Sequence, residues 1–231
     1  MEYSEQELLS RLPLQPTPTT SFKIARFFVV PILKTLFKFQ LDGLDNTLQG
    51  SHIVICNHLN WLDSFTILLA YPKNIRVHFL ANAEGMVKHK FQFWVLRKVG
   101  GYIPIVTTEH HNSSLYNIVD KAIELGCVIA IFPEGHYGND EKKLSEFHSG
   151  FAHFAINNKI PVVPSALIGT KNLWFRKRIK YTVGKPLQTS GVQVKELVDI
   201  SKKSIQNLLD SNEVSMKPGI HICKKLLTNL L

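Results

Sequence analysis

Short apolar runs alternate with amphipathic stretches through the middle of the chain. The runs are rich in β-branched residues and end at polar residues, glycine or proline, which is typical of buried strands. They cover residues 52–57, 76–80, 127–132, 161–168 and 179–183. The stretches between them predict helices at 61–70, 89–98, 112–125 and 146–157. Apolar strands that alternate with helices predict an α/β fold, whose mostly parallel or mixed central sheet is flanked by helices.

A different pattern fills residues 22–39, FKIARFFVVPILKTLFKF. On a helix its four cations share one arc of about 120°, and bulky apolar side chains dominate the rest; the cations are Lys23, Arg26, Lys34 and Lys38. A basic stripe beside an apolar face is typical of an interfacial helix on anionic lipid. The alternative is an amphipathic helix packed on its own domain. Pro31 is expected to kink this helix or to divide it in two.

These patterns predict a chain of two parts. Residues 1–40 are expected to form an N-terminal helical membrane-contact segment. Residues 41–231 are expected to form one α/β domain with a helical tail from residue 193, broken near residues 217–219.

Composition narrows the class of partner. The formal net charge of +9 over 231 residues favours an anionic partner, although no nucleic-acid-binding module is recognisable. The sequence contains no run of about 18 uncharged apolar residues, so no conventional membrane span is expected. The polar N-terminus does not resemble a signal peptide. Three scattered cysteines argue against a disulfide framework and for a reducing compartment.

The run at 52–57 ends in a pair of residues with chemical potential. His58 follows it directly, and Asp63 comes five residues later. On one continuous helix these side chains would diverge by about 140°. They meet only if His58 lies in a strand-to-helix turn and Asp63 in the first helical turn, with Asn60 as the expected cap. Such a pair can act as a general base, although a histidine near an aspartate is by itself a weak signal.

A second polar segment follows another buried run. Residues 127–132 are followed by Pro133-Glu134-Gly135. In open α/β sheets, ligands bind at the carboxyl ends of the strands. If the two runs are neighbouring parallel strands, His58 and Glu134 therefore face one crevice.

Four segments together resemble the signature blocks of the glycerolipid acyltransferases, the superfamily of glycerol-phosphate and lysophosphatidate acyltransferases. In the order of that family, they are Asn57-His58 with Asp63, then residues 101–105 (GYIPI), 132–135 (FPEG) and 160–164 (IPVVP). Each block is weak alone, whereas four in the right order are specific. The resemblance leaves residues 1–20 and about the last forty unexplained.

The resemblance implies transfer of a fatty acyl group from a thioester, on coenzyme A or acyl carrier protein, to the hydroxyl of a lipid acceptor. It implies His58 as the general base and Asp63 as the residue that orients it. The residues expected to bind substrate are Asn57, Gly101, Pro104, Glu134, Gly135 and His136. No metal and no cofactor beyond the acyl donor is implied. An enzyme of this kind is expected at the cytoplasmic face of a membrane, as a peripheral or monotopic protein.

The chain departs from the family where phosphate is bound. Relatives with phosphate-bearing acceptors usually carry an arginine after the second block and Thr-Arg after Pro-Glu-Gly, whereas this chain has 106–108 (VTT) and 136–138 (HYG). Because a bidentate arginine is the natural phosphate clamp, the departure predicts an acceptor other than simple glycerol phosphate, such as a lysophospholipid with a distant headgroup. Alternatively, Lys142, Lys143 or Arg176 reaches the phosphate from elsewhere.

Other functions stay open at this stage. A thioesterase or transacylase would use the same base, and a non-catalytic lipid-binding protein would keep only the fold. Cys56 is a rival nucleophile for a covalent route, because residues 56 and 58 of one strand share a face. The adjacent pair His110-His111 suggests a metal, but no further ligand spacing completes a zinc site.

Overall fold

The structure, a computed structural model, describes residues 14–82, 101–105, 113–212 and 224–229. In chain order its elements are α2 (Thr20–Leu36), β1 (Phe37–Asp42), the 3₁₀ turn η1 (Leu44–Asn46), β2 (His52–Cys56), α3 (Leu62–Ala70), β3 (Val77–Asn82), β4 (Tyr102–Ile105), α6 (Ser113–Glu124), β5 (Val128–Ile131), α7 (Gly150–Asn157), β6 (Val162–Ile168), β7 (Lys177–Val183), α8 (Val194–Ser211) and α9 (Lys224–Thr228). The helix expected at 89–98 and the break expected near 217–219 lie outside the described residues.

The strands form one mixed sheet, as the sequence predicts. Their order is β1-β7-β6-β2-β5-β3-β4. β6 and β7 pair in the antiparallel direction, and the other neighbouring pairs are parallel. The carboxyl ends of β2 and β5 therefore lie side by side at one edge of the sheet, which places the segments after them together.

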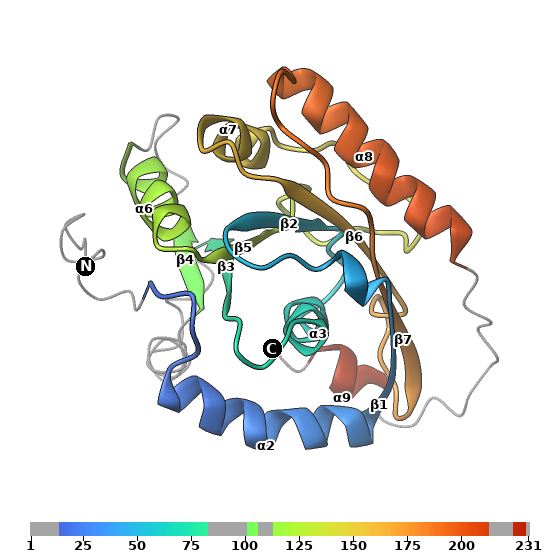
Figure 1. The fold of residues 1–231 in the computed structure, drawn as a ribbon. Coiled ribbons are helices and arrows are strands. Elements are labelled where there is room, and N and C mark those ends of the chain that lie inside the picture. The colour runs from blue at the N-terminus through green and yellow to red at the C-terminus, as the bar shows by residue number, and fades with distance from the viewer. Residues whose placement is uncertain (1–13, 83–100, 106–112, 213–223, 230–231) are drawn as a thin grey trace.

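Helices cover both faces of this sheet (Figure 1). α2, α3 and α9 lie on one face, and α6, α7 and α8 lie on the other. The sequence of β2 shows why, since Val54 and Cys56 belong to the first core and Ile53 and Ile55 to the second. All four are fully buried, as expected for a central strand with helices on both sides.

The helix predicted at 22–39 ends earlier than expected, and it is not divided in two at Pro31. α2 ends at Leu36, so Lys38 lies on β1, where it pairs with Arg178 of β7. Pro31 lies inside α2, which continues on both sides of it. The helix ends at Leu36 because the backbone N–H of Arg176 donates to the Leu36 carbonyl and Phe37 is already extended.

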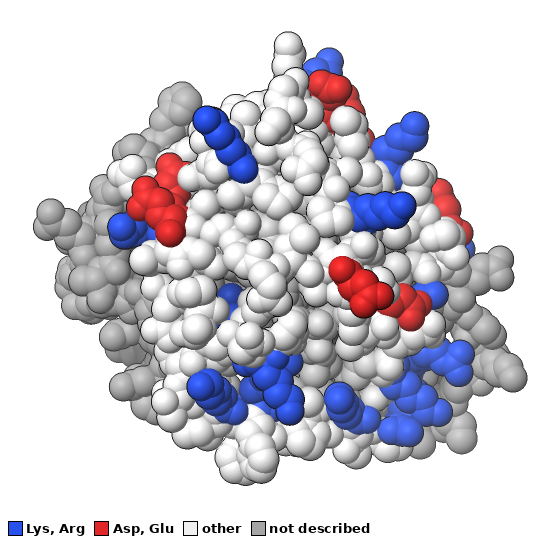
Figure 2. Space-filling model, in the orientation of Figure 1, with Lys and Arg blue, Asp and Glu red and all other residues white. Residues whose placement is uncertain are grey.

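Cations and apolar side chains are both exposed along α2. Figure 2 shows Lys and Arg side chains along the edge of the molecule where α2 lies in Figure 1. None of the helices in the described part of the chain is long and apolar enough to cross a lipid bilayer.

Candidate active site

His58 and Asp63 meet in the turn that joins β2 to α3. The His58 Nδ1 atom lies 2.9 Å from the Asp63 Oδ2 atom, where the two side chains share a hydrogen bond. The same oxygen accepts the backbone N–H groups of Leu59 and Asn60. The Asp63 side chain is fully buried, whereas 19% of the His58 side chain is exposed. Three donors thus offset the cost of burying the Asp63 charge and fix the imidazole beside it.

Asn60 does not cap the helix as expected. The residue at the N-cap position of α3 is Trp61, which makes no side-chain cap hydrogen bond. The Asp63 carboxylate reaches back to the turn instead. The Asn60 side chain donates to the carbonyl of Thr228, and Trp61 Nε1 donates to the carbonyl of Leu227 at 2.9 Å. The C-terminal helix α9 therefore holds the turn that carries His58.

Two aromatic rings pack against the imidazole of His58. The Phe132 ring stacks on His58 with centroids 3.8 Å apart and an interplanar angle of 7°. The Tyr137 ring lies 4.4 Å from the imidazole centroid and is tilted by 55°. Within the described residues, Nε2 of His58 has no hydrogen-bond partner. The ring is thus held by one nitrogen and by two aromatic contacts, and Nε2 keeps its capacity for a further hydrogen bond.

Glu134 binds backbone rather than facing outward. Its side chain is buried, with 2% of the residue exposed. Oε1 accepts the backbone N–H of His58 at 3.1 Å, and Oε2 accepts the backbone N–H of Ser145 at 2.8 Å. The carboxylate therefore ties the turn of His58 to the segment that follows the third block.

Gly135 and His136 follow Glu134 on the exposed side of the loop. Gly135 has φ +71°, and a Cβ atom there would lie 3.0 Å from the His148 ring. Glycine is therefore the residue that fits without strain. Nδ1 of His136, an exposed residue, lies 2.6 Å from the Glu134 carbonyl oxygen. Both residues thus lie beside Glu134 in the loop that follows β5.

Asn57, expected to bind substrate, binds backbone in the structure. Its Nδ2 atom donates to the Leu167 carbonyl at 2.9 Å, and its Oδ1 atom accepts the Leu167 N–H at 2.8 Å. Only 2% of the residue is exposed. The amide thus extends the pairing of β2 with β6 by side-chain atoms, which leaves neither end of it for a substrate.

Gly101 and Pro104 lie apart from His58. β4 is separated from β2 by β5 and β3, which corresponds to about 14 Å across three strand spacings. Gly101 has φ +96°, and its carbonyl accepts the N–H of Phe79 at the start of the β3–β4 pair. Pro104 pairs with Ala81 further along. The structure does not bring this block beside the imidazole.

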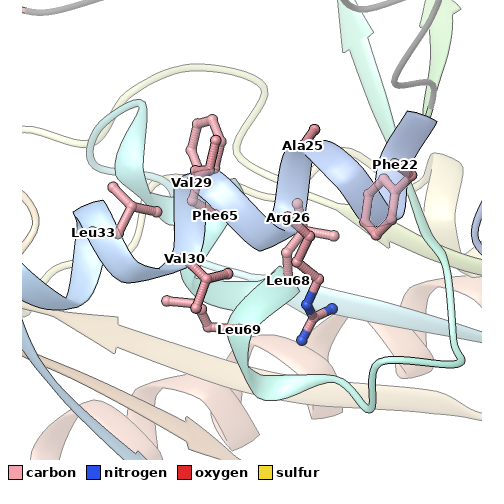
Figure 3. A pocket seen from close by; sticks show the side chains of 9 residues that line it. All are labelled: Phe22, Ala25, Arg26, Val29, Val30, Leu33, Phe65, Leu68 and Leu69. Carbon is pink, nitrogen blue, oxygen red and sulfur yellow. The ribbon is translucent and has the colours of Figure 1, made fainter. Parts of the chain in front are cut away.

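The four cations expected on the lipid-facing stripe separate into two groups. Lys23, Lys34 and Lys38 are exposed. Arg26 is partly buried, and one of its Nη atoms donates to the Tyr71 carbonyl at 3.0 Å. Burial lowers the pKa of Arg26. It faces inward, and with eight mostly apolar neighbours of α2 and α3 it lines a cavity (Figure 3). Arg26 therefore does not belong to the exposed basic stripe that the sequence predicts.

Bulky apolar side chains occupy the outer face of α2 instead. The exposed fractions are 55% for Ile24, 73% for Phe27, 62% for Phe28 and 58% for Ile32. Four such residues on one short helix form a contiguous apolar surface of the kind that marks an interaction site.

Three groups near His58 carry no signal in the local sequence. Tyr137 contacts the imidazole with its ring. The N–H of Gly138 donates to the His58 carbonyl at 2.6 Å, and the Gly138 carbonyl accepts from Nζ of Lys171. The contacts of α9 complete this set. Because Lys171 and α9 are distant in sequence from His58, only the folded chain shows them.

The structure describes Cys56, the rival nucleophile, but not the two histidines that suggest a metal. Cys56 is fully buried, and burial, followed by the charge of Asp63, raises the pKa of its thiol well above the ordinary value. A buried thiol of this kind is unreactive. No group of three or more His, Cys, Asp or Glu residues in the described part of the chain is arranged to hold a metal ion. His110 and His111 lie outside that part.

Comparisons with known proteins identify the family of the chain. Residues 38–168 match the family model Acyltransferase. Over 144 residues the chain is 28% identical to a 1-acyl-sn-glycerol-3-phosphate acyltransferase of Cocos nucifera, covering 58% of this chain and 44% of that protein. Over 210 residues it is 24% identical to the Saccharomyces cerevisiae protein of the same name, covering 84% and 67%.

The fold has a solved counterpart. The crystal structure of the 1-acyl-sn-glycerophosphate (LPA) acyltransferase PlsC from Thermotoga maritima matches with a TM-score of 0.66 at 18% identity, over 82% of this chain and 78% of that one. The region matched in the Cocos nucifera protein is less than half of that protein's length. Because the family model spans more than half of the chain, and its matched region contains His58, Asp63 and Glu134, the chain belongs to the Acyltransferase family.

Proposed function

We propose that this protein is a membrane-associated O-acyltransferase that moves a fatty acyl group from a thioester to a hydroxyl of a lysophospholipid. The observation that carries the proposal is the 2.9 Å hydrogen bond between His58 Nδ1 and the buried Asp63 carboxylate, with Nε2 left without a partner among the described residues. The names of the relatives, 1-acyl-sn-glycerol-3-phosphate acyltransferases, support the acceptor class.

The reaction needs a base because a lipid hydroxyl holds its proton tightly. His58 Nε2 takes this proton as the hydroxyl oxygen attacks the thioester carbonyl, and the Asp63 charge stabilises the imidazolium that forms. The tetrahedral intermediate collapses, and the bond between carbon and sulfur breaks. The imidazolium returns its proton to the departing thiolate. The products are an ester and a free thiol, and no group on the protein is acylated.

The donor is an acyl thioester of coenzyme A or of acyl carrier protein. Both carry the same reacting bond, and both carriers are anionic, in keeping with the formal net charge of +9. Parallel assays with the two thioesters distinguish them.

The outer face of α2 is proposed to lie on the membrane surface, as in a peripheral or monotopic protein. It combines four exposed apolar side chains with the exposed cations Lys23 and Lys34, the combination that favours anionic lipid interfaces. Phe28→Ser is expected to reduce co-sedimentation with anionic vesicles by about fivefold. Ile200→Ser, which changes an exposed residue of α8 on the opposite side of the sheet, serves as the matched control. Equal retention by the two variants would contradict the proposed surface.

The activity itself is tested with purified full-length protein, a labelled acyl thioester and a set of lysophospholipids, with products identified by mass. His58→Ala is expected to lower kcat about 10³-fold. Thiol release without an acylated lipid would indicate a thioesterase. Turnover that is unchanged in His58→Ala, or absent from the wild-type protein with every acceptor, would defeat the proposal.

A further inference from the structure

The segment after the third block lacks the arginine expected there, yet a lysine from another part of the chain contacts this segment. Tyr137 stands where relatives usually carry arginine, and its ring lies 4.4 Å from the His58 imidazole centroid. Lys171, from the connection between β6 and β7, donates from Nζ to the carbonyl of Gly138, the residue after Tyr137. The fold thus brings Lys171 to a segment whose motif contains no arginine.

This ammonium group lies close to the reacting histidine. Gly138 accepts from Lys171 through its carbonyl and donates through its N–H to the His58 carbonyl at 2.6 Å. One residue therefore separates the two contacts, which places Nζ within about 8 Å of the His58 backbone. In a 1-acyl glycerol 3-phosphate, the phosphate is carried on the carbon next to the one that bears the reacting hydroxyl. A phosphate of the acceptor is thus expected near this part of the turn.

The charge of Lys171 is not neutralised by the carboxylate beside it. The side chain of Glu141 accepts the backbone N–H of Lys171 at 3.2 Å, and its ion pair, at 3.6 Å, is with Lys177. In the described part of the chain, Lys171 forms no ion pair. Lys224 of α9 acts on Lys177 electrostatically and adds to the local positive charge. Lys171, Lys177 and Lys224 thus bring more positive charge to this part of the fold than Glu141 offsets, which favours an anion.

Other cations named for this role do different work or lie elsewhere. Arg176 Nη1 lies 3.4 Å from the carbonyls of Lys34 and Thr35 and caps the end of α2. Lys142 is exposed, and its backbone N–H and carbonyl bind Asp140 and Gln206. Lys171 differs from both because its Nζ atom contacts a residue hydrogen-bonded to His58.

We propose that Lys171 binds the phosphate of the lysophospholipid acceptor and so sets the acceptor specificity of the site. This inference rests on the proposed function. A lysine ammonium has three donors, of which the Gly138 carbonyl uses one, so two remain for phosphate oxygens. The Lys171 ammonium binds the phosphate as a single positive charge, whereas an arginine would bind it with two parallel hydrogen bonds. Monoesters and diesters share this chemistry, and a neutral acylglycerol lacks it.

The test compares two acceptors that differ in phosphate. Purified full-length enzyme is assayed with a 1-acyl glycerol 3-phosphate and with a monoacylglycerol of the same chain length. Lys171→Gln removes the charge and keeps a donor for Gly138. It is expected to raise KM for the phosphate-bearing acceptor about tenfold, while KM for monoacylglycerol and for the donor stays within about twofold. Lys171→Arg is expected to restore KM to within about threefold. Lys203→Gln, which makes the same change of charge at an exposed lysine of α8, is the matched control.

Several outcomes overturn the proposal. Equal losses with both acceptors mean that Lys171 holds the Gly138 segment rather than phosphate. A raised KM for the donor alone assigns the lysine to the carrier of the thioester. An unchanged KM for the phosphate-bearing acceptor in Lys171→Gln means that Lys171 does not bind the phosphate.

A binding measurement separates this proposal from the proposed function. Titration of the enzyme with glycerol 3-phosphate, a soluble mimic of the acceptor headgroup, is expected to show about tenfold weaker binding to Lys171→Gln than to wild type and to Lys203→Gln. Weaker binding with no acyl transfer would keep the phosphate site and reject the transferase. Acyl transfer with equal binding by all three proteins would keep the transferase and reject the phosphate site.

Discussion

Two segments meet at the imidazole of His58, and each brings one buried carboxylate. In the turn of residues 57–63, the Asp63 carboxylate contacts the imidazole as well as two backbone N–H groups. In the loop of residues 132–138, the Glu134 carboxylate contacts only backbone N–H groups, those of His58 and Ser145. Both residues are almost completely buried. Burial alone therefore does not identify a chemical role, and the atoms that each carboxylate contacts are what separate the two.

The two segments have different roles in the site. In the proposed mechanism, the turn supplies the group that moves a proton and the charge that supports it. The loop supplies the framework, because Glu134 anchors the backbone of His58 while Phe132 and Tyr137 hold the ring. A change in the turn should thus affect catalysis with little effect on stability, and a change in the loop should affect both.

Asp63→Asn tests the catalytic half of this division, and we expect the largest effect there. Among the described residues, Oδ1 of Asp63 has no hydrogen-bond partner, so the new NH₂ group can take its place while the amide oxygen keeps the other contacts. The free energy of unfolding should change by about 1 kcal/mol or less. A neutral amide cannot stabilise the imidazolium, so kcat should fall about 10²-fold. Steady-state kinetics and urea unfolding check both. Near-normal turnover would remove Asp63 from the mechanism.

Glu134→Gln tests the structural half. The amide must place its NH₂ group against one of the two backbone N–H donors, so one hydrogen bond is lost in a buried place. We expect the free energy of unfolding to fall by about 2 kcal/mol and kcat to fall about tenfold as the turn of His58 loosens. Glu146→Gln, at a side chain that is 95% exposed, is the control. If the variant is as stable as wild type and only KM for the acceptor rises, Glu134 binds the acceptor and the division fails.

The sequence predicts the turn better than the loop for a physical reason. His58 and Asp63 are five residues apart, so local geometry alone decides whether they meet. The partners of Asn57 and of Glu134 are tertiary, and the Leu167 backbone that binds Asn57 is 110 residues away. Motif position assigned both residues to substrate, and only the fold shows that their polar atoms bind backbone.

The helices and strands follow the same rule, since local patterns predict some of them and distant contacts determine the others. Buried strands such as β2 and β6 are visible because β-branched residues fill them. β1 is missed because Phe37–Asp42 continues the amphipathic pattern of the helix before it, and its strand state depends on pairing with the distant β7. The hydrogen bonds of α9 to Asn60 and Trp61 span 168 and 166 residues. No local pattern encodes contacts of that range.

Tyr137 sharpens the comparison within the loop. Its ring contacts the imidazole, and burial, followed by the charge of Asp63, raises the pKa of its phenol, which stays neutral. Tyr137→Leu should lower kcat about threefold, because the imidazole gains freedom to rotate. Tyr137→Phe keeps the ring and should stay within about twofold of wild type. An equal loss in both variants would show that the hydroxyl contacts substrate, which would make the loop chemical as well as structural.

Cys56→Ala should have the smallest effect, and it asks whether the turn holds a second reacting group. The thiol is fully buried at the end of β2, and burial raises its pKa well above the ordinary value, so the thiolate is absent at neutral pH. We expect kcat within about twofold of wild type and a loss of stability of about 1 kcal/mol from the small cavity. Mass spectrometry of the wild-type enzyme during turnover should show no acyl group on Cys56. An acylated Cys56 peptide would move the nucleophile from the lipid hydroxyl to the protein, and His58 would then act on a thiol. Unchanged turnover in Cys56→Ala leaves the imidazole as the one group of this turn that handles the proton.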